Sequence, residues 1–332
     1  LTFEGTVFAL DRTKALGPEE LFELYKTDPL SFPNKLDGHY VIKLYDAARQ
    51  KHLIINDILK NKINYITENE RFIMITPLLL TAALIRRPEV DAEAYNEFMW
   101  RYYLLSRRSV LKDVSKLTEA SVYEISRNAI SRKSYWDWPQ SYTTISFSEA
   151  TDRMTESMKE SARLVYETFG KPCIDFTMGQ DTRQVLSAFR NQEIPLATSI
   201  FGGDAFYEAQ QMKKVSRKHG IEHHNIQLRE DYLDHLWDYF RKALELGSHE
   251  EPGHLLSRIL YMRERQKEYG NVVCNGQEGH FYKNGLWDEM YTINFYREPE
   301  GFNKELFYRT RVLSTNYRDD MFTPEFRRVK EH

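Results

Sequence analysis

The sequence predicts an α/β protein in two parts: an antiparallel, β-rich first part and a second part built on a parallel sheet covered by helices. Through the first 75 residues, short apolar runs recur about every ten residues, the spacing of an antiparallel meander or sandwich. From residue 147, strand-like segments alternate with helical ones, which favours a parallel sheet. The 332 residues suffice for each part to bury its own core.

In the first part, the expected strands cover 2–10, 40–45, 52–57, 63–67 and 71–76, with a turn at 36–39. Residues 77–110 have a helical pattern, in which Pro88 and Asp91 mark the start of a second helix. A polar, aromatic stretch at 131–144 predicts the connection to the second part. We therefore expect one domain over 1–140.

The second part, expected over 147–332, begins with a predicted helix at 148–170. The expected strands that follow cover 172–176, 196–201, 221–228 and 271–274, with helices between them. This alternation predicts parallel strands joined by helical crossovers.

Composition narrows the function classes. Hydrophobic residues make up 41% and charged residues 29%, values typical of globular proteins. A net charge of −3 lacks the basic excess of nucleic-acid binders, so we expect no nucleic-acid partner. No apolar run approaches the roughly 20 residues of a membrane span, and no signal peptide is visible. Two cysteines, Cys173 and Cys274, suit a reducing cytoplasm, where we place the protein.

The most informative segment is Phe176-Thr177-Met178-Gly179-Gln180-Asp181-Thr182-Arg183, which follows a buried strand and opens a helix. Ligands of α/β sheets bind at this position. The hydroxyls of Thr177 and Thr182 and the backbone amides around Gly179 could cradle a phosphate, and Asp181 could hold Mg²⁺. The alternative is an ordinary strand-to-helix turn in which Asp181 is an N-terminal cap.

Further along the chain come the strand Thr198-Ser199-Ile200-Phe201, then Gly220-Ile221-Glu222-His223-His224, and finally Val272-Val273-Cys274-Asn275-Gly276-Gln277-Glu278-Gly279. In kind and order, these segments resemble the asparagine-synthetase family. In that family the loop reads S-G-G-x-D-S or T, and the last strand ends in S-G-x-G-x-D-E.

The first part carries matching segments. Leu36-Asp37-Gly38-His39-Tyr40-Val41 looks like the family's L-D-G-x-F-A, Ile54-Ile55-Asn56-Asp57 looks like its A-R-D, and Tyr135-Trp136-Asp137 looks like its Y-W-D. The resemblance implies a glutaminase-like (Ntn-type) β domain over 1–140. It implies a PP-loop synthetase domain, similar to adenine nucleotide α-hydrolases, over 147–332.

The function that the resemblance implies is ATP-dependent amide formation through an acyl-adenylate, in an AMP-forming carbon–nitrogen ligase of biosynthesis. ATP and Mg²⁺ are the implied cofactors. The implied partners are a small-molecule or peptide carboxylate and an amine donor, with a homodimer or a partner chain; natural products, peptides and polysaccharides are the candidate targets. Carried to matching positions, the nucleotide-binding residues are Thr177, Gly179, Gln180, Thr182, Arg183, Ile200, Asn275 and Gly276. Asp181 would be the catalytic residue and would bind magnesium.

Four features depart from the family pattern. The chain begins at Leu1, without the amino-terminal cysteine that attacks glutamine in the family. Met178 replaces the first glycine of the loop, where a side chain could crowd a phosphate. The family's acidic pair falls on His280 and Phe281, leaving Glu278 as the alternative magnesium ligand. The chain stops at His332, so we expect a truncated second domain.

These departures leave an alternative function open: a degenerate relative that binds a nucleotide or a partner without turnover. Two other groups of residues, a histidine pair and an arginine pair, are not expected to act in binding or catalysis. Adjacent strand residues point to opposite faces, so His223 and His224 are not expected to share a metal ion. Arg327 and Arg328 are expected to form a solvated face.

Overall fold

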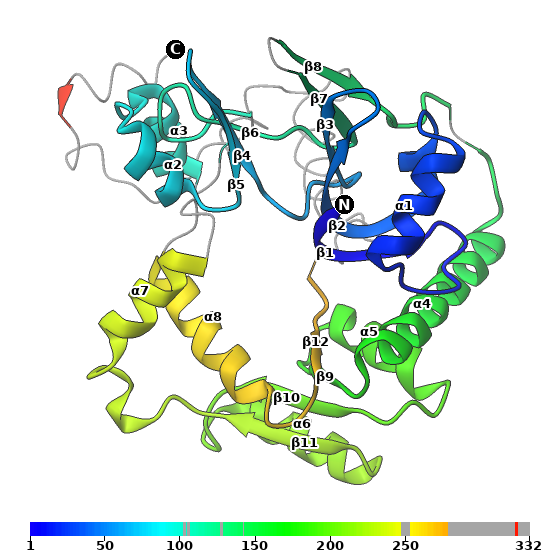
Figure 1. Cartoon of the computed structure of the whole chain (residues 1–332). Helices are drawn as coiled ribbons and strands as arrows, with labels where there is room; N and C mark the ends of the chain where they lie inside the picture. Colours follow the sequence, from blue (N-terminus) through cyan, green and yellow to red (C-terminus); the bar gives the residue numbers. More distant parts are fainter. Residues whose placement is uncertain are drawn as a thin grey trace, which may run out of the picture.

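The computed structural model describes residues 1–101, 104, 107–126, 129–141, 143–246, 253–277 and 323–324. It is mixed α/β, with antiparallel sheets in the first part and a parallel sheet in the second, as the sequence predicts (Figure 1). The elements of the first part are β1 (Thr2–Ala9), α1 (Pro18–Thr27), η1 (Phe32–Lys35), β2 (Leu36–Asp46), β3 (Lys51–Asn56), β4 (Tyr65–Glu68), β5 (Ile73–Thr76), α2 (Leu79–Arg86), α3 (Ala92–Arg101), β6 (Ser115–Lys116), β7 (Ser121–Ser126) and β8 (Ala129–Ser134).

The larger antiparallel sheet has the strand order β1-β2-β3-β7-β8, and its central strands β2 and β3 bury side chains on both faces. Within β2, Tyr40 and Ile42 pack with Leu21 of α1 in one apolar cluster. Val41, between them, belongs to a second cluster with Ile54 on the opposite face. The period-2 alternation of a strand therefore supplies two cores from one sheet.

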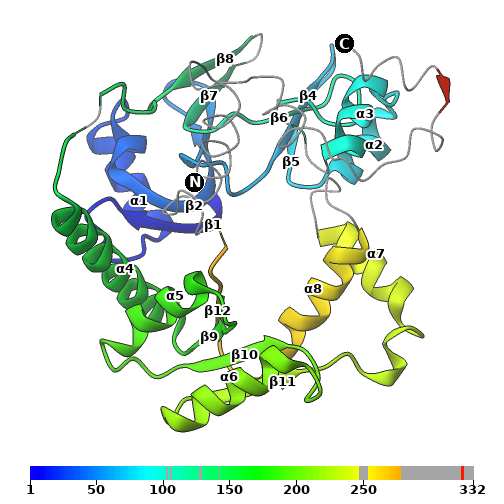
Figure 2. The ribbon, with the colours of Figure 1, turned by 180° about the vertical axis from the view of Figure 1, so that it is seen from behind.

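The smaller sheet, in the order β5-β4-β6, closes the second of these cores. Ile66 of β4 faces the larger sheet, whereas the preceding Tyr65 packs against Leu79 and Ala82 of α2. The layers are thus α1, the five-stranded sheet, the three-stranded sheet and α2. Both views place α1 and α2 on opposite sides of the strands (Figures 1 and 2). The expected sandwich is confirmed, with a helix covering each outer face.

Four local predictions were wrong. The first 75 residues were predicted to contain strands and turns and no helix, yet α1 forms there, and Pro18 at its first position and an acidic first turn are helix-start signals. Residues 36–39 were predicted as a turn but extend β2. Residues 107–110 were predicted helical but lie beyond α3, in a segment held by isolated bridges. The predicted connection at 131–144 begins only after β8 ends at Ser134.

The error at 36–39 has a backbone cause. Gly38 has φ +116° and pairs with Val7 of β1. A Cβ at Gly38 would lie 2.4 Å from the carbonyl oxygen of Thr6, so glycine here permits close strand approach. The glycine that indicated a turn is therefore a strand residue.

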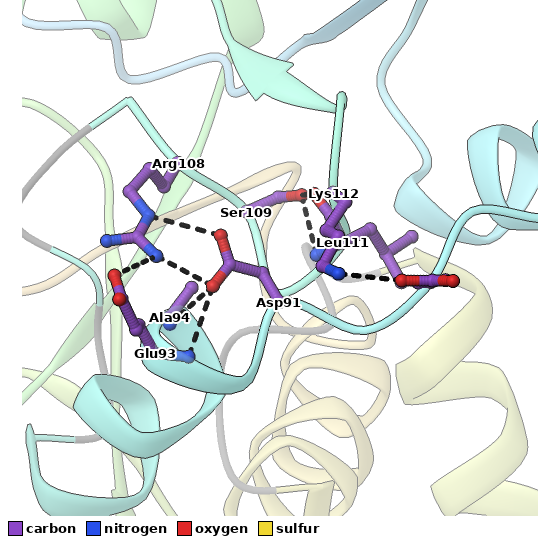
Figure 3. A network of polar contacts seen from close by, with 8 residues as sticks. Asp91, Glu93, Ala94, Arg108, Ser109, Leu111 and Lys112 are labelled. Atoms are coloured by element: carbon purple, nitrogen blue, oxygen red, sulfur yellow. Dashed lines mark hydrogen bonds and ion pairs between the residues drawn. The ribbon is translucent and has the colours of Figure 1, made fainter. Parts of the chain in front are cut away.

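Asp91 begins α3, as predicted. Its Oδ1 accepts hydrogen bonds from the amides of Glu93 and Ala94, at 3.1 and 3.0 Å (Figure 3). Arg108 donates to both carboxylate oxygens of Asp91, at 3.3 and 2.6 Å, and to Glu93 at 3.1 Å. Burial raises the pKa of Asp91, but these hydrogen bonds outweigh it and the net pKa is lowered. The same contact with Asp91 raises the pKa of Arg108.

The elements of the second part are α4 (Phe147–Phe169), β9 (Pro172–Asp175), α5 (Gln180–Arg190), β10 (Ala197–Phe201), α6 (Tyr207–Lys218), β11 (Glu222–Ile226), η2 (Glu230–Tyr232), α7 (Leu236–Leu246), α8 (Gly253–Gln266) and β12 (Val272–Cys274). The four strands pair in parallel in the order β11-β10-β9-β12. Each predicted strand and the predicted helix at 148–170 are confirmed to within about two residues.

Helices cover both faces of the parallel sheet. Ile174 and Ile200 pack with residues of α4, α5 and α6 in one cluster, and Ile226 packs with residues of α7 and α8 in another. Both views place α4 and α5 to one side of the strands and α7 and α8 to the other (Figures 1 and 2). Among the described residues, no helix has both the length and the apolar character that crossing a bilayer requires.

The first part contacts α4 directly through Arg12. Its guanidinium pairs with Asp37 and donates to Ser157 Oγ at 3.1 Å, and its carbonyl oxygen accepts from Arg163 at 3.3 Å. Arg12 has φ +55°, a left-handed conformation that a non-glycine residue rarely adopts. These contacts join the first layers of the chain to the helix that introduces the parallel sheet.

Candidate functional site

The candidate site lies where the strand order of the parallel sheet reverses. β9 is the first strand of this sheet in the chain, and its neighbours are the second strand, β10, and the last described one, β12. The chain therefore leaves β9 and β12 at adjacent positions on the carboxyl edge. Crevices at such switch points are the ligand sites of open α/β sheets. Residues 176–179 and 275–277 form the two loops at this place.

The loop after β9 is closed by two threonine hydroxyls. Thr182 Oγ1 accepts a hydrogen bond from the Thr177 amide at 3.2 Å, and the two hydroxyls lie 3.1 Å apart. The Gly179 amide donates to Thr177 Oγ1 at 3.1 Å. Thr177, Gly179 and Thr182, which the sequence predicts to act together, thus form one hydrogen-bonded turn at the start of α5.

The loop after β12 lies directly against this turn. A Cβ at Gly276 would lie 2.6 Å from the amide nitrogen of Thr182 and 2.7 Å from the Cβ of Asp181. These separations leave no room for a side chain. The structure therefore brings Asn275 and Gly276 together with the residue 177–183 segment, which lies far away in the sequence. The Asn275 side chain accepts from the Gln277 amide at 3.0 Å and shapes the loop.

Asp181 is not the cap of α5, so the ordinary-turn alternative is wrong in that respect. The helix begins at Gln180, the cap position is Gly179, and Asp181 is half-buried in the first turn. Gln180 is exposed, and Arg183 donates from Nε to the Gly179 carbonyl at 3.2 Å. A carboxylate in the first turn interacts favourably with the helix dipole, whatever else it binds.

A cavity of about 230 Å³ lies beside the loop, over the carboxyl ends of β9 and β10. Thr177 and Ile200 line it, together with Glu208 of α6 and Arg258 of α8. Ile200, predicted to contact the nucleotide, is thereby placed next to the loop. Arg258 lies over the ring of Phe201 with 4.9 Å between the guanidinium carbon and the ring centroid, so it forms a cation–π wall of the cavity.

Met178, whose side chain was expected to crowd a phosphate, does not fill the loop, because that side chain is 47% exposed. Its amide donates to Glu208 Oε1 at 2.6 Å. A carboxylate of the protein itself therefore accepts a hydrogen bond from the loop that the sequence predicts to bind phosphate. Sequence reasoning did not identify Glu208, since its contact depends on how α6 packs.

Asp175, the last residue of β9, is a second residue of the site that was not predicted from the sequence. Arg263 donates from Nη1 to its two carboxylate oxygens at 3.0 and 2.9 Å, and Gln266 donates to it at 2.5 Å. Gln266 is fully buried and also donates to Ser199 Oγ at 2.7 Å. This network fixes α8 over the carboxyl edge and so holds one wall of the cavity. Arg263 and Gln266 lie three apart on one helix face, which is the one local signal for the pair.

The two histidines of β11 have separate environments. His223 Nδ1 lies 2.9 Å from Thr198 Oγ1, and burial lowers its pKa to about 4. The His224 ring stacks on Tyr269 with 3.6 Å between centroids, and its Nε2 lies 3.0 Å from Glu222. Within the described part of the chain, no group of three or more His, Cys, Asp or Glu side chains could hold a metal ion.

Neither cysteine has the setting of a nucleophile. Cys173 is buried in β9 and Cys274 ends β12, and burial raises the pKa of both thiols, to about 12 for Cys274. Reactive cysteines have lowered pKa values. Of the remaining predicted positions, Glu278, His280, Phe281, Arg327 and Arg328 lie outside the described residues.

Comparison with known proteins identifies the first part. Residues 17–136 match the sequence model of the glutamine amidotransferase domain, so this stretch is glutamine amidotransferase-like. No curated protein matches the chain. The matched residues run from the cap of α1 to just beyond β8 and so contain most of the layered first part. Both cysteines lie outside the match.

Proposed function

We propose that residues 147–332 form a PP-loop synthetase domain and that the protein is an ATP-dependent, AMP-forming carbon–nitrogen ligase. The observation that carries this proposal is the fit of Gly276 against Asp181 and Thr182, which joins two loops at the switch point of a parallel sheet. A glycine with no room for a side chain, beside a helix N-terminus, is typical of loops that let a phosphate approach backbone.

The amidotransferase-like stretch supports the same reaction class. Such domains supply nitrogen, and a synthetase attached to one needs an activated acyl group to receive it. ATP can activate a carboxylate by forming an acyl-adenylate with release of pyrophosphate, after which an amine displaces AMP. The amine would be ammonia or an amine of the substrate. The protein's part would be positioning and charge neutralisation.

In this proposal the loop would hold a nucleotide with one magnesium ion. Magnesium is commonly held by one or two carboxylates plus substrate phosphates, so a single protein carboxylate at the loop is sufficient. Asp181 would provide it, and the ion would neutralise charge on the pyrophosphate. The residues that would contact the nucleotide are Thr177, Gly179, Gln180, Thr182, Arg183, Ile200, Asn275 and Gly276.

One observation favours the alternative, a relative that binds a nucleotide or a partner without turnover. The Glu208 carboxylate already accepts a hydrogen bond from the Met178 amide and would repel a phosphate there. Calorimetric titration with Mg²⁺-ATP tests the proposal: we expect saturable binding that Asp181→Asn weakens at least about tenfold. An absence of binding would refute the ATP site, whereas binding without turnover would favour the alternative.

A further inference from the structure

A second cavity, of about 830 Å³, lies in the amidotransferase-like part of the chain. Its wall is formed by β4 and the turn after it, the end of α2, the segment before β6, and β7 and β8. This volume lies within the usual range for small-molecule sites, about 300–1,000 Å³. No residue of this wall belongs to the candidate site at the parallel sheet.

Four arginines from separate segments converge on this cavity: Arg71, Arg86, Arg107 and Arg132. Arg107 donates from Nε to the Lys116 carbonyl at 3.3 Å, and Arg132 donates to Thr118 Oγ1 at 2.9 Å. Among the described residues, no carboxylate forms an ion pair with Arg71, Arg107 or Arg132. Their positive charges are therefore available to a ligand.

Adjacent Arg108 shows the contrast. It is paired with Asp91 and Glu93, which neutralise it and fasten it to the start of α3 (Figure 3). Arg107, one residue earlier, lines the cavity and, among the described residues, donates to a neutral carbonyl and to no carboxylate. The same short segment thus contains one arginine held by carboxylates and one without a carboxylate partner.

Within the described part of the chain, two polar atoms of the wall are buried without a hydrogen-bond partner: Thr67 Oγ1 and Arg86 Nε. Thr67 is 3% exposed, and the Arg86 side chain is 21% exposed. A buried donor without an acceptor destabilises the folded protein. Such groups normally have a partner in the protein, in water or in a ligand. Both atoms are donors with almost no accessible surface, so an oxygen of a bound group would satisfy them after a small rearrangement of the wall.

Three carboxylates also line the cavity, and all are exposed: Glu68, Glu70 and Asp113. Asp113 Oδ2 lies 4.0 Å from Arg86 Nη2, which is the one ion pair that the four arginines form with described residues. Four positive charges against three negative ones leave a small positive excess, with hydroxyl and guanidinium donors on the more buried wall. This balance suits a small anion better than an extended polyanion.

We propose that this cavity binds a small oxyanion, a carboxylate or a phosphate monoester, through Arg86 and Arg107 with Thr67 as a hydroxyl donor. Guanidinium groups suit both anions because they donate two parallel hydrogen bonds to paired oxygens. This site is independent of the proposed ATP site. The amidotransferase-like part would recognise this ligand by its negative charge and by hydrogen bonds to its oxygens.

The test is calorimetric titration of the 332-residue protein with inorganic phosphate and, separately, with citrate. We expect saturable binding of at least one, which identifies the favoured anion class, with affinity about tenfold weaker in Arg107→Gln and in Thr67→Val. Thr67→Val keeps the side-chain shape, and removing an unpartnered hydroxyl leaves the protein equally or more stable to urea. Arg153→Gln removes a similar charge from exposed α4 and is the matched control.

Asp181→Asn separates this proposal from the nucleotide site, because it leaves phosphate or citrate binding unchanged. The proposal is overturned if neither anion binds saturably to the parent protein. It is equally overturned if binding occurs but Thr67→Val and Arg107→Gln weaken it no more than Arg153→Gln does.

Discussion

Gly276 and Asp181 are in backbone-to-side-chain contact: a Cβ added to Gly276 would lie 2.7 Å from the Cβ of Asp181. The loop after β12 therefore rests on the first turn of α5. Because both loops sit where the strand order reverses, a ligand bound in the crevice between β9 and β12 would lie beside both. Because of this contact, replacing Gly276 by alanine, which adds a single methyl group, tests whether the site binds a ligand.

Gly276→Ala is expected to displace the loop and to weaken Mg²⁺-ATP binding about tenfold or more, because overpacking costs about 1–3 kcal/mol. Titration calorimetry measures the effect. Gly17→Ala is the control, since its new Cβ would meet its nearest neighbour, Glu20, at an ordinary 3.8 Å. Equal ATP affinity in Gly276→Ala and in the parent protein would show that nucleotide binding does not depend on this contact.

Glu208→Gln is expected to strengthen ATP binding about fivefold, because it removes a negative charge that costs about 1 kcal/mol beside a phosphate. The same titration measures it, with exposed Glu245→Gln on α7 as the charge-matched control. Weaker binding in Glu208→Gln than in the control would instead mean that Glu208 helps to hold the nucleotide or its metal.

Arg263→Gln is expected to lower the free energy of unfolding by about 1–3 kcal/mol, because Asp175 loses a charged hydrogen-bond partner in a partly buried network. Urea denaturation gives the value. Arg241→Gln, which breaks an exposed pair three residues apart with Asp238, should change stability by less than about 0.5 kcal/mol. Similar losses in both variants would contradict a special role for the Asp175 network.

The free energy of unfolding should fall as the pH is lowered through the range in which His223 takes up a proton in the unfolded chain but not in the folded protein. Its pKa is about 4 when folded and near 6.5 when unfolded, so below pH 6.5 the unfolded chain binds a proton that the folded protein excludes. The loss continues until the pH reaches about 4. In His223→Gln, denaturation between pH 6.5 and 4 should show a smaller loss. An identical pH profile in both proteins would contradict burial of a neutral His223.

Cys173 and Cys274 are expected to react slowly with iodoacetamide at pH 8 in the folded protein and rapidly in urea, because burial raises the pKa of both thiols. Mass spectrometry of the labelled cysteines follows the reaction. Rapid labelling of either thiol in the folded protein would show a nucleophilic cysteine that the structure does not indicate.

The alternation of helices and strands in the second part was predictable from the sequence, because helices alternating with short apolar strands permit few arrangements other than a parallel sheet. The loop at Thr177 to Thr182 was predictable for the same reason: it joins a buried strand to a helix. The capping of α3 by Asp91 was predictable from local chemistry alone. These features depend on neighbours in sequence.

What the sequence did not reveal depends on residues far apart in the chain. Asp175 and Arg263 meet across 88 positions, and Glu208 reaches the Met178 amide only because α6 packs beside the loop. Gly38, where a turn was predicted, lies within β2 because this part of β2 pairs with β1. The cavity beside Thr67 required the side chains of five segments to converge.

ATP–pyrophosphate exchange tests most directly our proposal that the parallel-sheet part activates a carboxylate with ATP. With Mg²⁺ and a panel of carboxylates, we expect exchange dependent on one or a few of them and lost in Asp181→Asn. No exchange with any carboxylate, together with no calorimetric binding of Mg²⁺-ATP, would contradict the account.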